Sequence, residues 1–252
     1  MKKARKTFLA IAGAALAVTA INAVTSNPSA AEDPDKEAVR KIVKEYLNEH
    51  PELVIQALET YQANQEEFEK RRFKETFESA KPDLIAEGLP YIGNPNGDVV
   101  IVEFFDYNCG YCKRALKDIQ TLIKNDDNIK VIFHEMPILS GASNDAARYA
   151  LAANMQDKYF EYHQAIMNMA GAKTRNNLES EAEKLGLDLA KLREDANSRA
   201  VRQQIEQSLS LSRKLGIRGT PAFIIGDILA PGYMPWQDIH NIVKQVRDEN
   251  KG

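Results

Sequence analysis

The sequence predicts an α/β domain preceded by a helical N-terminal extension, and three observations carry this prediction. Residues 33–81 are polar, highly charged and periodic in the helical sense, whereas the composition from Pro82 onward is that of a compact mixed domain. An apolar, β-branched run at 98–105 is typical of a strand buried on both faces. Two short apolar runs around Gly226 and Asp227 predict a closing hairpin.

Residues 1–31 have the parts of an export signal. Basic residues at positions 2, 3, 5 and 6 precede an apolar run at 8–24, and Ser29, Ala30 and Ala31 form a cleavage site before Glu32. The alternative is an uncleaved anchor, because the run has about the minimum length of a tilted membrane helix. The Ala- and Thr-rich run and the cleavage sequence favour removal. Removal takes away four positive charges and no negative one, so the formal net charge moves from -3 to -7. An acidic protein of this kind is a poor candidate for binding nucleic acid or an anionic membrane surface.

The extension at 32–81 predicts two helices. Asp33 and Pro34 form a helix start, Pro51 begins a second helix that runs to about residue 80, and Phe73 and Phe77 fall outside its apolar register. That register is a narrow stripe with Gln65 in one vacant slot, formed by Val54, Leu58, Tyr61 and Phe68. A narrow apolar stripe on a long charged helix must find a partner. Folding back onto the main domain is one solution; we favour self-association, which predicts a homo-oligomer formed through residues 33–81.

The pattern of residues 82–252 predicts alternating strands and helices. A strand at 98–105 is followed by a helix at about 113–124 and a strand at 129–133. A helical stretch then covers about 143–215, with breaks near Gly171 and Gly186. Short strands at 221–225 and 228–231 and a helix from about 235 complete the domain.

Cys109 and Cys112 are the two cysteines of the chain, and they flank Gly110 and Tyr111. A disulfide stabilises a fold mainly by closing a long loop in the unfolded chain, and this pair would close almost none. The spacing therefore indicates thiol chemistry. Export favours this interpretation, because disulfides persist in oxidising compartments.

Two motifs, set within this order of strands and helices, resemble those of the bacterial periplasmic disulfide-bond (Dsb) proteins. The segment at 102–112 is similar to their active-site segment, and Gly219, Thr220, Pro221 and Ala222 match their second signature, a Thr followed by a cis-proline that faces the thiols. The helical insertion at about 143–215 resembles the DsbA-like oxidase branch, whereas Cys-Gly-Tyr-Cys and the loops at 219–233 are closer to the DsbC-like isomerase branch. A helical extension on a DsbA-like domain is similar to the suppressor-of-copper-sensitivity (ScsC) family. The resemblance implies a thioredoxin fold with a helical insertion and a location in the periplasm.

The position of Cys109 and Cys112 relative to the predicted helix indicates their chemical roles. Cys109 comes at the start of the predicted helix, where the macrodipole and free backbone N–H groups stabilise a thiolate, so we expect it to be the exposed nucleophile. Cys112, one turn further on, is positioned to resolve a mixed disulfide. Gly110 and Tyr111 between them offer no basic side chain, which predicts a moderate stabilisation of the thiolate.

Further site residues depend on the resemblance. Glu103 interrupts an apolar strand, which is costly unless the carboxyl has a partner or a task. It resembles the family's buried acid, which would exchange protons with Cys112; the alternative is a strand-end Glu that reaches solvent. Thr220 and Pro221 would present a backbone edge to a substrate segment as an added strand. Tyr107, Tyr111 and Tyr233 could line a substrate groove, although Tyr107 could equally be packing.

No cofactor is expected other than the redox-active disulfide of Cys109 and Cys112. The four histidines, at 50, 134, 163 and 240, are scattered and show no zinc-ligand spacing, so we expect no metal site among them. Cu(I) remains a candidate ligand of the two thiolates, because soft sulfur ligands suit that ion.

Three functional hypotheses follow. The first is an oligomeric disulfide isomerase or reductase that acts on misfolded exported proteins and is kept reduced by a membrane thiol reductase. The second is a DsbA-like thiol oxidase that introduces disulfides and is kept oxidised by a membrane partner. The third is a Cu(I)-binding protein of copper tolerance, suggested by the ScsC resemblance. We favour the first, because of the isomerase-like loops and the long N-terminal helix.

Overall fold

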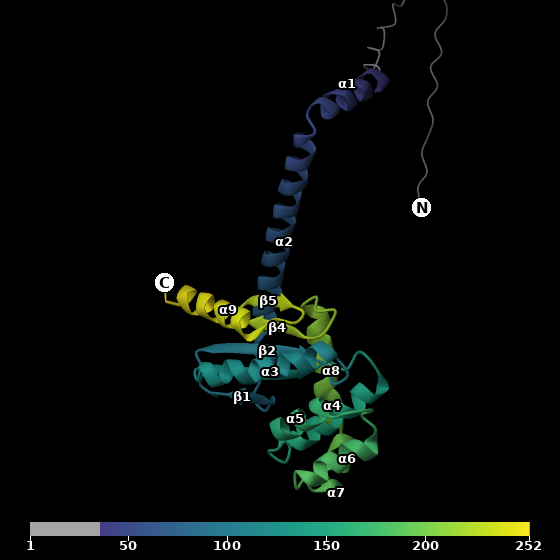
Figure 1. Cartoon of the computed structure of the whole chain (residues 1–252), viewed down its shortest axis with the longest axis vertical. Coiled ribbons are helices and arrows are strands. Elements are labelled where there is room, and N and C mark those ends of the chain that lie inside the picture. Colours follow the sequence, from purple (N-terminus) through teal and green to yellow (C-terminus); the bar gives the residue numbers. More distant parts are fainter. Residues whose placement is uncertain (1–35, 252) are drawn as a thin grey trace, which may run out of the picture. The chain divides into compact units, whose positions relative to one another are not determined.

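The computed structural model describes residues 36–251, and the chain divides into two compact units between Tyr61 and Gln62. Each unit is described by itself (Figure 1). The predicted export signal at 1–31 and the helix start at Asp33 and Pro34 lie outside the described residues. None of the helices within 36–251 is long and apolar enough to cross a membrane.

The described part of the first unit is helical, as the sequence predicts. Helix α1 spans Lys36–Glu49 and helix α2 spans Glu52–Leu84, with the break at His50 and Pro51. Helix α1 buries no residue. Apolar side chains along both helices are exposed to solvent, among them Ile42, Val43, Tyr46, Val54, Ile55, Leu58 and Tyr61. Within residues 36–251, no other part of the chain covers this apolar stripe.

The last part of α2 belongs to the second unit. Phe77, Ala80 and Leu84 are buried there against the sheet. This packing explains why Phe73 and Phe77 fall outside the apolar register of the preceding stripe. Helix α2 also continues through Pro82 to Leu84, past the predicted end near residue 80. The change in composition at 81/82 thus falls inside a helix whose final turns are held by core contacts.

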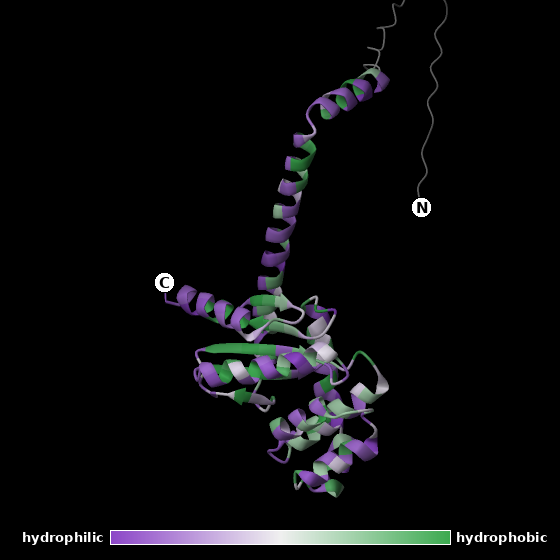
Figure 2. Cartoon of the chain, in the orientation of Figure 1, coloured by the Kyte–Doolittle hydropathy of each residue, from purple (hydrophilic) through white to green (hydrophobic). Residues whose placement is uncertain are grey.

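The second unit is built on a mixed five-stranded sheet in the order β1-β3-β2-β4-β5. Strand β2 is central; it pairs in parallel with β3 and antiparallel with β4. Figure 2 shows that β2 is hydrophobic along most of its length, as the apolar run predicts. Strand β1 is short and was not expected from the sequence, because three residues carry no periodic signal. The strands are Tyr91–Gly93, Val99–Phe105, Ile129–Glu135, Ala222–Ile225 and Ile228–Pro231 for β1 to β5.

Seven helices follow β2 within the described residues. The predicted helical insertion consists of α4 to α8, and the breaks near Gly171 and Gly186 are confirmed. Two further breaks follow α4 and α7; at the second, the Ser198 side chain caps α8 by accepting a hydrogen bond from the backbone N–H of Val201. The helices are Gly110–Asn125, Gly141–Asn154, Tyr159–Asn168, Arg175–Lys184, Leu189–Ala196, Arg199–Lys214 and Trp236–Glu249 for α3 to α9.

The sheet has two covered faces, and strand periodicity assigns each residue to one of them. Ile101 and Phe105 of β2 belong to the core under α3, α9 and the helical insertion. Val102 and Phe104 belong to the core under α8 and the end of α2. Glu103 shares the parity of Ile101 and Phe105, so it lies on the α3 face, which carries the cysteines.

The β4–β5 hairpin confirms the two-residue turn predicted at Gly226 and Asp227. Gly226 has a φ of +62°, and a Cβ atom at this position would lie 2.8 Å from Cγ1 of Val246 in α9. Glycine is therefore required both by the backbone and by the close approach of α9.

Candidate active site

Cys109 occupies the N-cap position of α3, immediately after β2 and a short turn. Its side chain is partly exposed, and its Sγ lies 3.2 Å from the carbonyl oxygen of Thr220. The turn is closed by the backbone N–H of Cys109, which donates to the carbonyl of Asp106 at 3.0 Å. A thiol held at a helix N-terminus faces backbone N–H groups that have no partner within the helix.

Cys112 lies one turn further along α3 and is buried, with 1% of its surface exposed. Both cysteines are free thiols. Burial raises the pKa of the Cys112 thiol, and the negative charge of Glu103 raises it further. The backbone of Asp106 and the Thr220 side chain act in the opposite direction on this pKa. Cys112 is therefore a buried, protonated thiol, and a base would have to take its proton before its sulfur could attack another sulfur.

Glu103 is buried in the middle of β2, with 2% of its surface exposed, and does not reach solvent as a strand-end Glu would. Burial raises the pKa of its carboxyl to about 8, with a smaller contribution from Cys109. The negative charge of an ionised Glu103 in turn raises the pKa of the Cys112 thiol. A carboxyl with a pKa near the ambient pH can hold or release a proton as the thiol chemistry requires.

The Thr220–Pro221 peptide bond is cis, as the resemblance implied. Thr220 is brought to the cysteines from a position 111 residues further along the chain. Pro221 directly precedes β4, and its carbonyl accepts a hydrogen bond from the backbone N–H of Gly232 at 2.9 Å. The two segments after the helical insertion thus meet beside the thiols.

The residues between the cysteines differ in their surroundings. Tyr111 is exposed and lies in an aromatic cluster, with its ring centroid 6.2 Å from that of Tyr233. The Arg114 guanidinium lies 4.5 Å from the Tyr233 centroid and 5.8 Å from that of Tyr111. A Cβ atom at Gly110 would meet no atom within 4 Å, so packing does not demand glycine there.

Asp106 is a site residue that the sequence analysis did not single out. It is buried at 1% exposure and accepts four hydrogen bonds. Oδ1 accepts from the backbone N–H of Asn108 and from the Ser143 hydroxyl, and Oδ2 accepts from the backbone N–H groups of Ile138 and Leu139. The carboxylate therefore ties the turn before Cys109 to the loop before α4. Its place at the end of a buried strand was the available signal.

A second buried acid, Glu135, was also missed. Its Oε1 accepts hydrogen bonds from the hydroxyls of Tyr107, at 3.2 Å, and Tyr159, at 2.9 Å. The Tyr107 hydroxyl also lies 2.9 Å from Nδ1 of His163. Burial raises the pKa of the Glu135 carboxyl and lowers that of His163 to about 3, so His163 is neutral near pH 7. Tyr107 is thus a buried anchor of the turn before Cys109, not part of a substrate groove.

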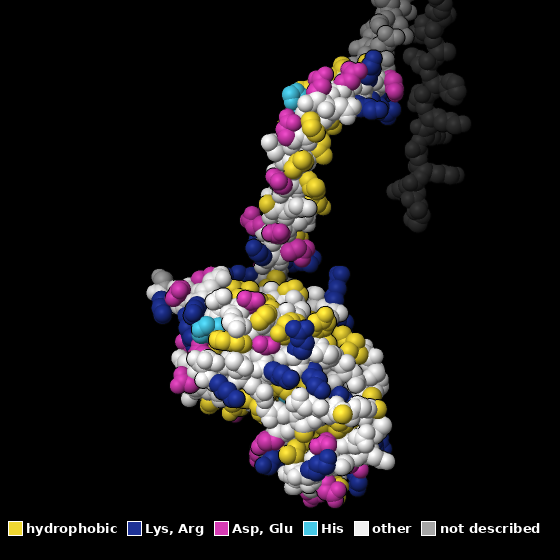
Figure 3. All heavy atoms as spheres, in the orientation of Figure 1, with side chains coloured by type: hydrophobic (Ala, Val, Ile, Leu, Met, Phe, Trp, Pro, Cys, Tyr) yellow, Lys and Arg dark blue, Asp and Glu magenta, His cyan; other side chains and the backbone are white. Residues whose placement is uncertain are grey.

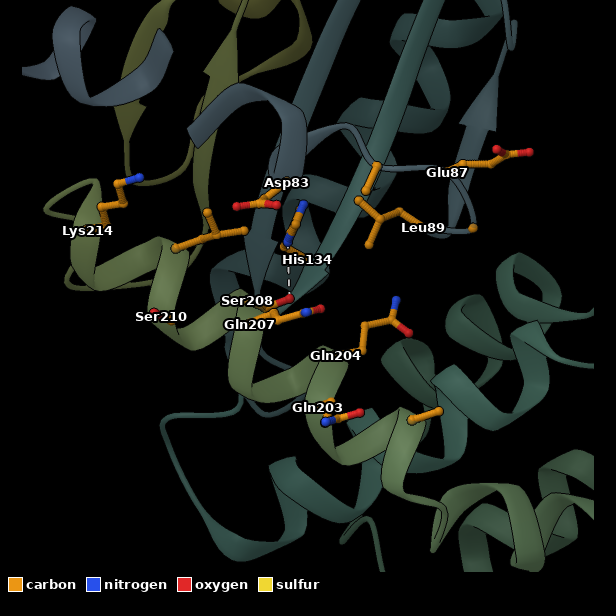
Figure 4. A pocket seen from close by; sticks show the side chains of 14 residues that line it. Asp83, Glu87, Leu89, His134, Gln203, Gln204, Gln207, Ser208, Ser210 and Lys214 are labelled. Atoms are coloured by element: carbon orange, nitrogen blue, oxygen red, sulfur yellow. Dashed lines mark hydrogen bonds between the residues drawn. The ribbon is translucent and has the colours of Figure 1, made fainter. Parts of the chain in front are cut away.

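A hollow of about 600 Å³ lies on the opposite face of the sheet (Figure 4). The His134 side chain reaches into it from β3. Its ring nitrogens are hydrogen-bonded to the Ser208 hydroxyl, at 3.1 Å, and to the Leu84 carbonyl, at 3.0 Å. His134 shares the face of Phe104, whereas Glu103 faces α3. The hollow is therefore separate from the thiols.

The histidines form no zinc site within the described residues, where no group of three or more potential ligands comes together. His134 and His163 are buried with hydrogen-bond partners, and His50 is bonded to Glu52. His240 lies 3.7 Å from Asp126. These contacts are those of histidines with structural roles.

The geometry agrees with comparisons to known proteins. Residues 100–245 match the DSBA-like thioredoxin domain. The chain belongs to the DSBA-like thioredoxin family. In addition, residues 35–67 match the N-terminal domain of the copper resistance protein ScsC, so both parts of the resemblance drawn from the sequence are confirmed.

Solved structures of this DSBA-like family are similar over most of their length. A thioredoxin-like oxidoreductase of Silicibacter pomeroyi is 40% identical, with 66% of this chain and 97% of that chain covered and a TM-score of 0.65. The thiol-disulfide exchange protein alpha-DsbA2 of Wolbachia pipientis is 34% identical (70% and 97% covered, TM-score 0.66). ScsC of Proteus mirabilis in a compact conformation is 26% identical (86% and 100% covered, TM-score 0.64).

The match to some curated relatives is partial. A Na(+)/H(+) antiporter of Salinispora arenicola is 27% identical over 135 residues, which are 53% of this chain and 21% of that protein. The chain thus spans about a fifth of the length of that relative. Membership of the DSBA-like thioredoxin family supports thiol–disulfide oxidoreductase chemistry.

Proposed function

We propose that the protein is a periplasmic thiol–disulfide oxidoreductase that acts as an oligomeric disulfide isomerase or reductase. The observation that carries the redox chemistry is the placement of Cys109. Its Sγ is partly exposed at the start of α3, 3.2 Å from the Thr220 carbonyl oxygen, while Cys112 and Glu103 are buried on the same face of the sheet. Relatives described as thiol-disulfide exchange and periplasmic thioredoxin-like proteins support this assignment.

The first step is attack by the Cys109 thiolate on a disulfide of a misfolded exported protein. The client S–S bond breaks, a Cys109–client S–S bond forms, and the other client sulfur leaves as a thiolate. In isomerisation that or another client thiolate attacks the mixed disulfide, which releases Cys109 with no net oxidation. Thr220 and Pro221 would hold the client segment beside the thiol as an added strand.

In the reductive branch Cys112 resolves the mixed disulfide. Glu103, when ionised, takes the Cys112 proton, and the resulting thiolate attacks Sγ of Cys109. The client leaves with two thiols, and Cys109 and Cys112 are left as a disulfide. A membrane thiol reductase would then supply the two electrons that restore the dithiol.

The proposal of an oligomer depends on the first unit. An apolar stripe that includes Leu58 and Tyr61 is exposed there. Such a stripe on a charged helix is buried most simply against other copies of itself. An isomerase benefits from several active sites around one client, because a client released by one can be rebound by another.

Reactivation of an enzyme with scrambled disulfides by the reduced protein tests the proposal. We expect reactivation by the reduced full chain and none by Cys109→Ala. The alternative is a DsbA-like oxidase. It would be indicated by absent reactivation together with fast oxidation of a reduced peptide by the disulfide form.

Binding of Cu(I) is a second candidate function, favoured by the match of residues 35–67 to the ScsC N-terminal domain. The free Cys109 and Cys112 are soft donors one helical turn apart. Titration of the reduced protein with Cu(I) should give one equivalent bound, and Cys109→Ser should lose it. Equal binding by the variant would contradict the assignment.

A further inference from the structure

A groove of about 1100 Å³ lies beside β5, the edge strand of the sheet. Its walls are the α2 residues 69–76, the end of α8 with the loop to 218, and β5 itself. Six basic side chains line it, against two acidic ones, Glu69 and Asp227. The basic residues of this groove are Lys70, Arg72, Lys74, Arg213, Lys214 and Arg218.

The groove keeps an excess of positive charge after internal pairing. Arg72 pairs with Glu69, and Lys74 pairs with Asp227 at 3.0 Å. Within residues 36–251 no carboxylate comes within 4.0 Å of the other four cations, so four charges remain available for a ligand. This sign is opposite to the formal charge of the chain, -3. Figure 3 shows Lys and Arg side chains around the part of α2 that joins the second unit.

Part of the groove lining is apolar. Phe73 and Leu229 line it and are partly buried against the core beneath α8. Ile228 of β5 also lines it and packs against the core on the α3 side. Sites for single small molecules usually range from about 300 to 1,000 Å³ and are well enclosed. A larger, open groove with a partly apolar lining and cationic walls fits an extended polypeptide better than a compact metabolite.

The groove ends close in the chain to the redox site. Arg218, which lines it, is two residues before Thr220, whose carbonyl oxygen lies 3.2 Å from Cys109 Sγ. Pro231 also lines the groove, and the next residue, Gly232, donates its N–H to the Pro221 carbonyl. The groove borders the core beneath α8, on the other face of the sheet from the thiols, so a client chain paired beside Thr220 and Pro221 reaches it by passing the edge strand β5.

We propose that this basic groove binds an acidic stretch of the client polypeptide next to the cysteine that reacts with Cys109. The inference rests on the proposed function, whose client class it narrows to proteins with Asp or Glu near the reacting disulfide. The cations attract such a segment over long range and increase its rate of encounter, an effect that ranges from about 10-fold to about 1,000-fold in other charged clefts. Added salt screens the attraction.

Two measurements on the full chain test the groove. In the first, the disulfide form oxidises two peptides that share a cysteine pair and differ only in flanking residues, Glu-rich or Lys-rich. We expect about 10-fold faster oxidation of the Glu-rich peptide at low salt, and a loss of that preference at 0.5 M NaCl. Lys70→Glu/Arg213→Glu should lose or reverse the preference, whereas Lys124→Glu/Arg199→Glu, the same charge change outside the groove, should keep it.

The second measurement is binding of a fluorescent Glu-rich peptide without cysteine, followed by anisotropy. We expect salt-sensitive binding that the groove variant weakens about 10-fold and the control variant does not. Equal oxidation rates for the two peptides, or equal binding by both variants, would overturn the inference. Binding at the groove without oxidation of either peptide would instead support the groove and contradict the proposed redox function.

Discussion

At the scale of single residues, we expect Glu103 to set the pH dependence of the resolving step. Its carboxyl has a pKa of about 8, so below that pH it holds a proton and above it can accept one from Cys112. Glu103→Gln removes this group and should slow reduction of a client disulfide by about 10²-fold, the lower end for a general base. The pH–rate profile should also lose its rise near pH 8. An unchanged profile would exclude Glu103 as the base.

The same carboxyl makes the fold less stable at high pH. The unfolded Glu has a pKa of about 4.3, so between there and about 8 the folded protein binds one proton more than the unfolded chain. The free energy of unfolding therefore falls with rising pH by about 1.4 kcal/mol per unit in this window. Urea unfolding should show Glu103→Gln to be stabilising at pH 8 and nearly neutral at pH 4. Equal effects at both pH values would contradict burial of the charge.

Asp106 holds the turn before Cys109 through its four accepted hydrogen bonds. Asp106→Ala leaves the buried backbone N–H groups of Ile138 and Leu139 without their acceptor. Each unsatisfied buried donor costs about 1–3 kcal/mol. In thermal unfolding, Asp106→Ala should lower the Tm by several degrees, and Asp106→Asn should lower it less. Similar Tm values for Asp106→Ala and the wild type would contradict this positioning role.

At the scale of elements, one side chain of α9 ties it to the residue before β2 and the residue after α3. Arg247 donates to Asp98 at 2.8 Å and to Asp126 at 2.6 Å, and it holds the pKa of Asp126 below its usual range. Arg247→Met should lower the free energy of unfolding by about 1.5–3 kcal/mol at pH 7, since charged hydrogen bonds are lost.

The pH dependence of the Arg247 effect has a defined sign. The stability that Asp126 gains from a lowered pKa is present above the unfolded Asp value, about 3.9, and is lost as pH falls through the folded pKa. The difference between wild type and Arg247→Met should therefore shrink below pH 4. A difference independent of pH would mean that Arg247 acts through packing alone.

The elements that the sequence predicts well are those with a strong period. The apolar run of β2 and the hairpin at Gly226 are where the pattern places them, and α3 starts three residues before the predicted position 113. Strand β1 and the end of α2 are not where the pattern places them, because a three-residue strand has no period and tertiary packing of Leu84 carries the helix past Pro82. The change in composition at 81/82 therefore does not coincide with the end of a helix, because the last turns of α2 pack on the core.

The site was predictable where a residue breaks the local pattern. Glu103 stands out in an apolar strand, and Cys109 and Cys112 stand out by spacing. Asp106, Glu135 and the Tyr107–His163 contact do not, because their partners come from loops and helices distant in the sequence. The basic groove was missed for the same reason, since its cations lie on two segments that only the fold brings together.

At the scale of the whole molecule, the exposed stripe of the first unit predicts assembly. Leu58→Asp places a charge on the stripe and should dissociate the oligomer, whereas Ala63→Asp on another face of α2 should not. Sedimentation of the two variants measures the difference. We expect the dissociated variant to lose reactivation of scrambled clients and to keep oxidation of a reduced peptide. A monomeric wild type, or a monomeric variant with full isomerase activity, would contradict the oligomeric isomerase.

The central claim is that Cys109 attacks client disulfides and Cys112 resolves the product. Trapping of mixed disulfides, separated on non-reducing gels, tests it most directly. Cys112→Ala should accumulate client-linked protein through Cys109 that a reductant releases, and Cys109→Ala should form none. Normal reduction of client disulfides by Cys112→Ala, or mixed disulfides formed by Cys109→Ala, would contradict the two-thiol mechanism.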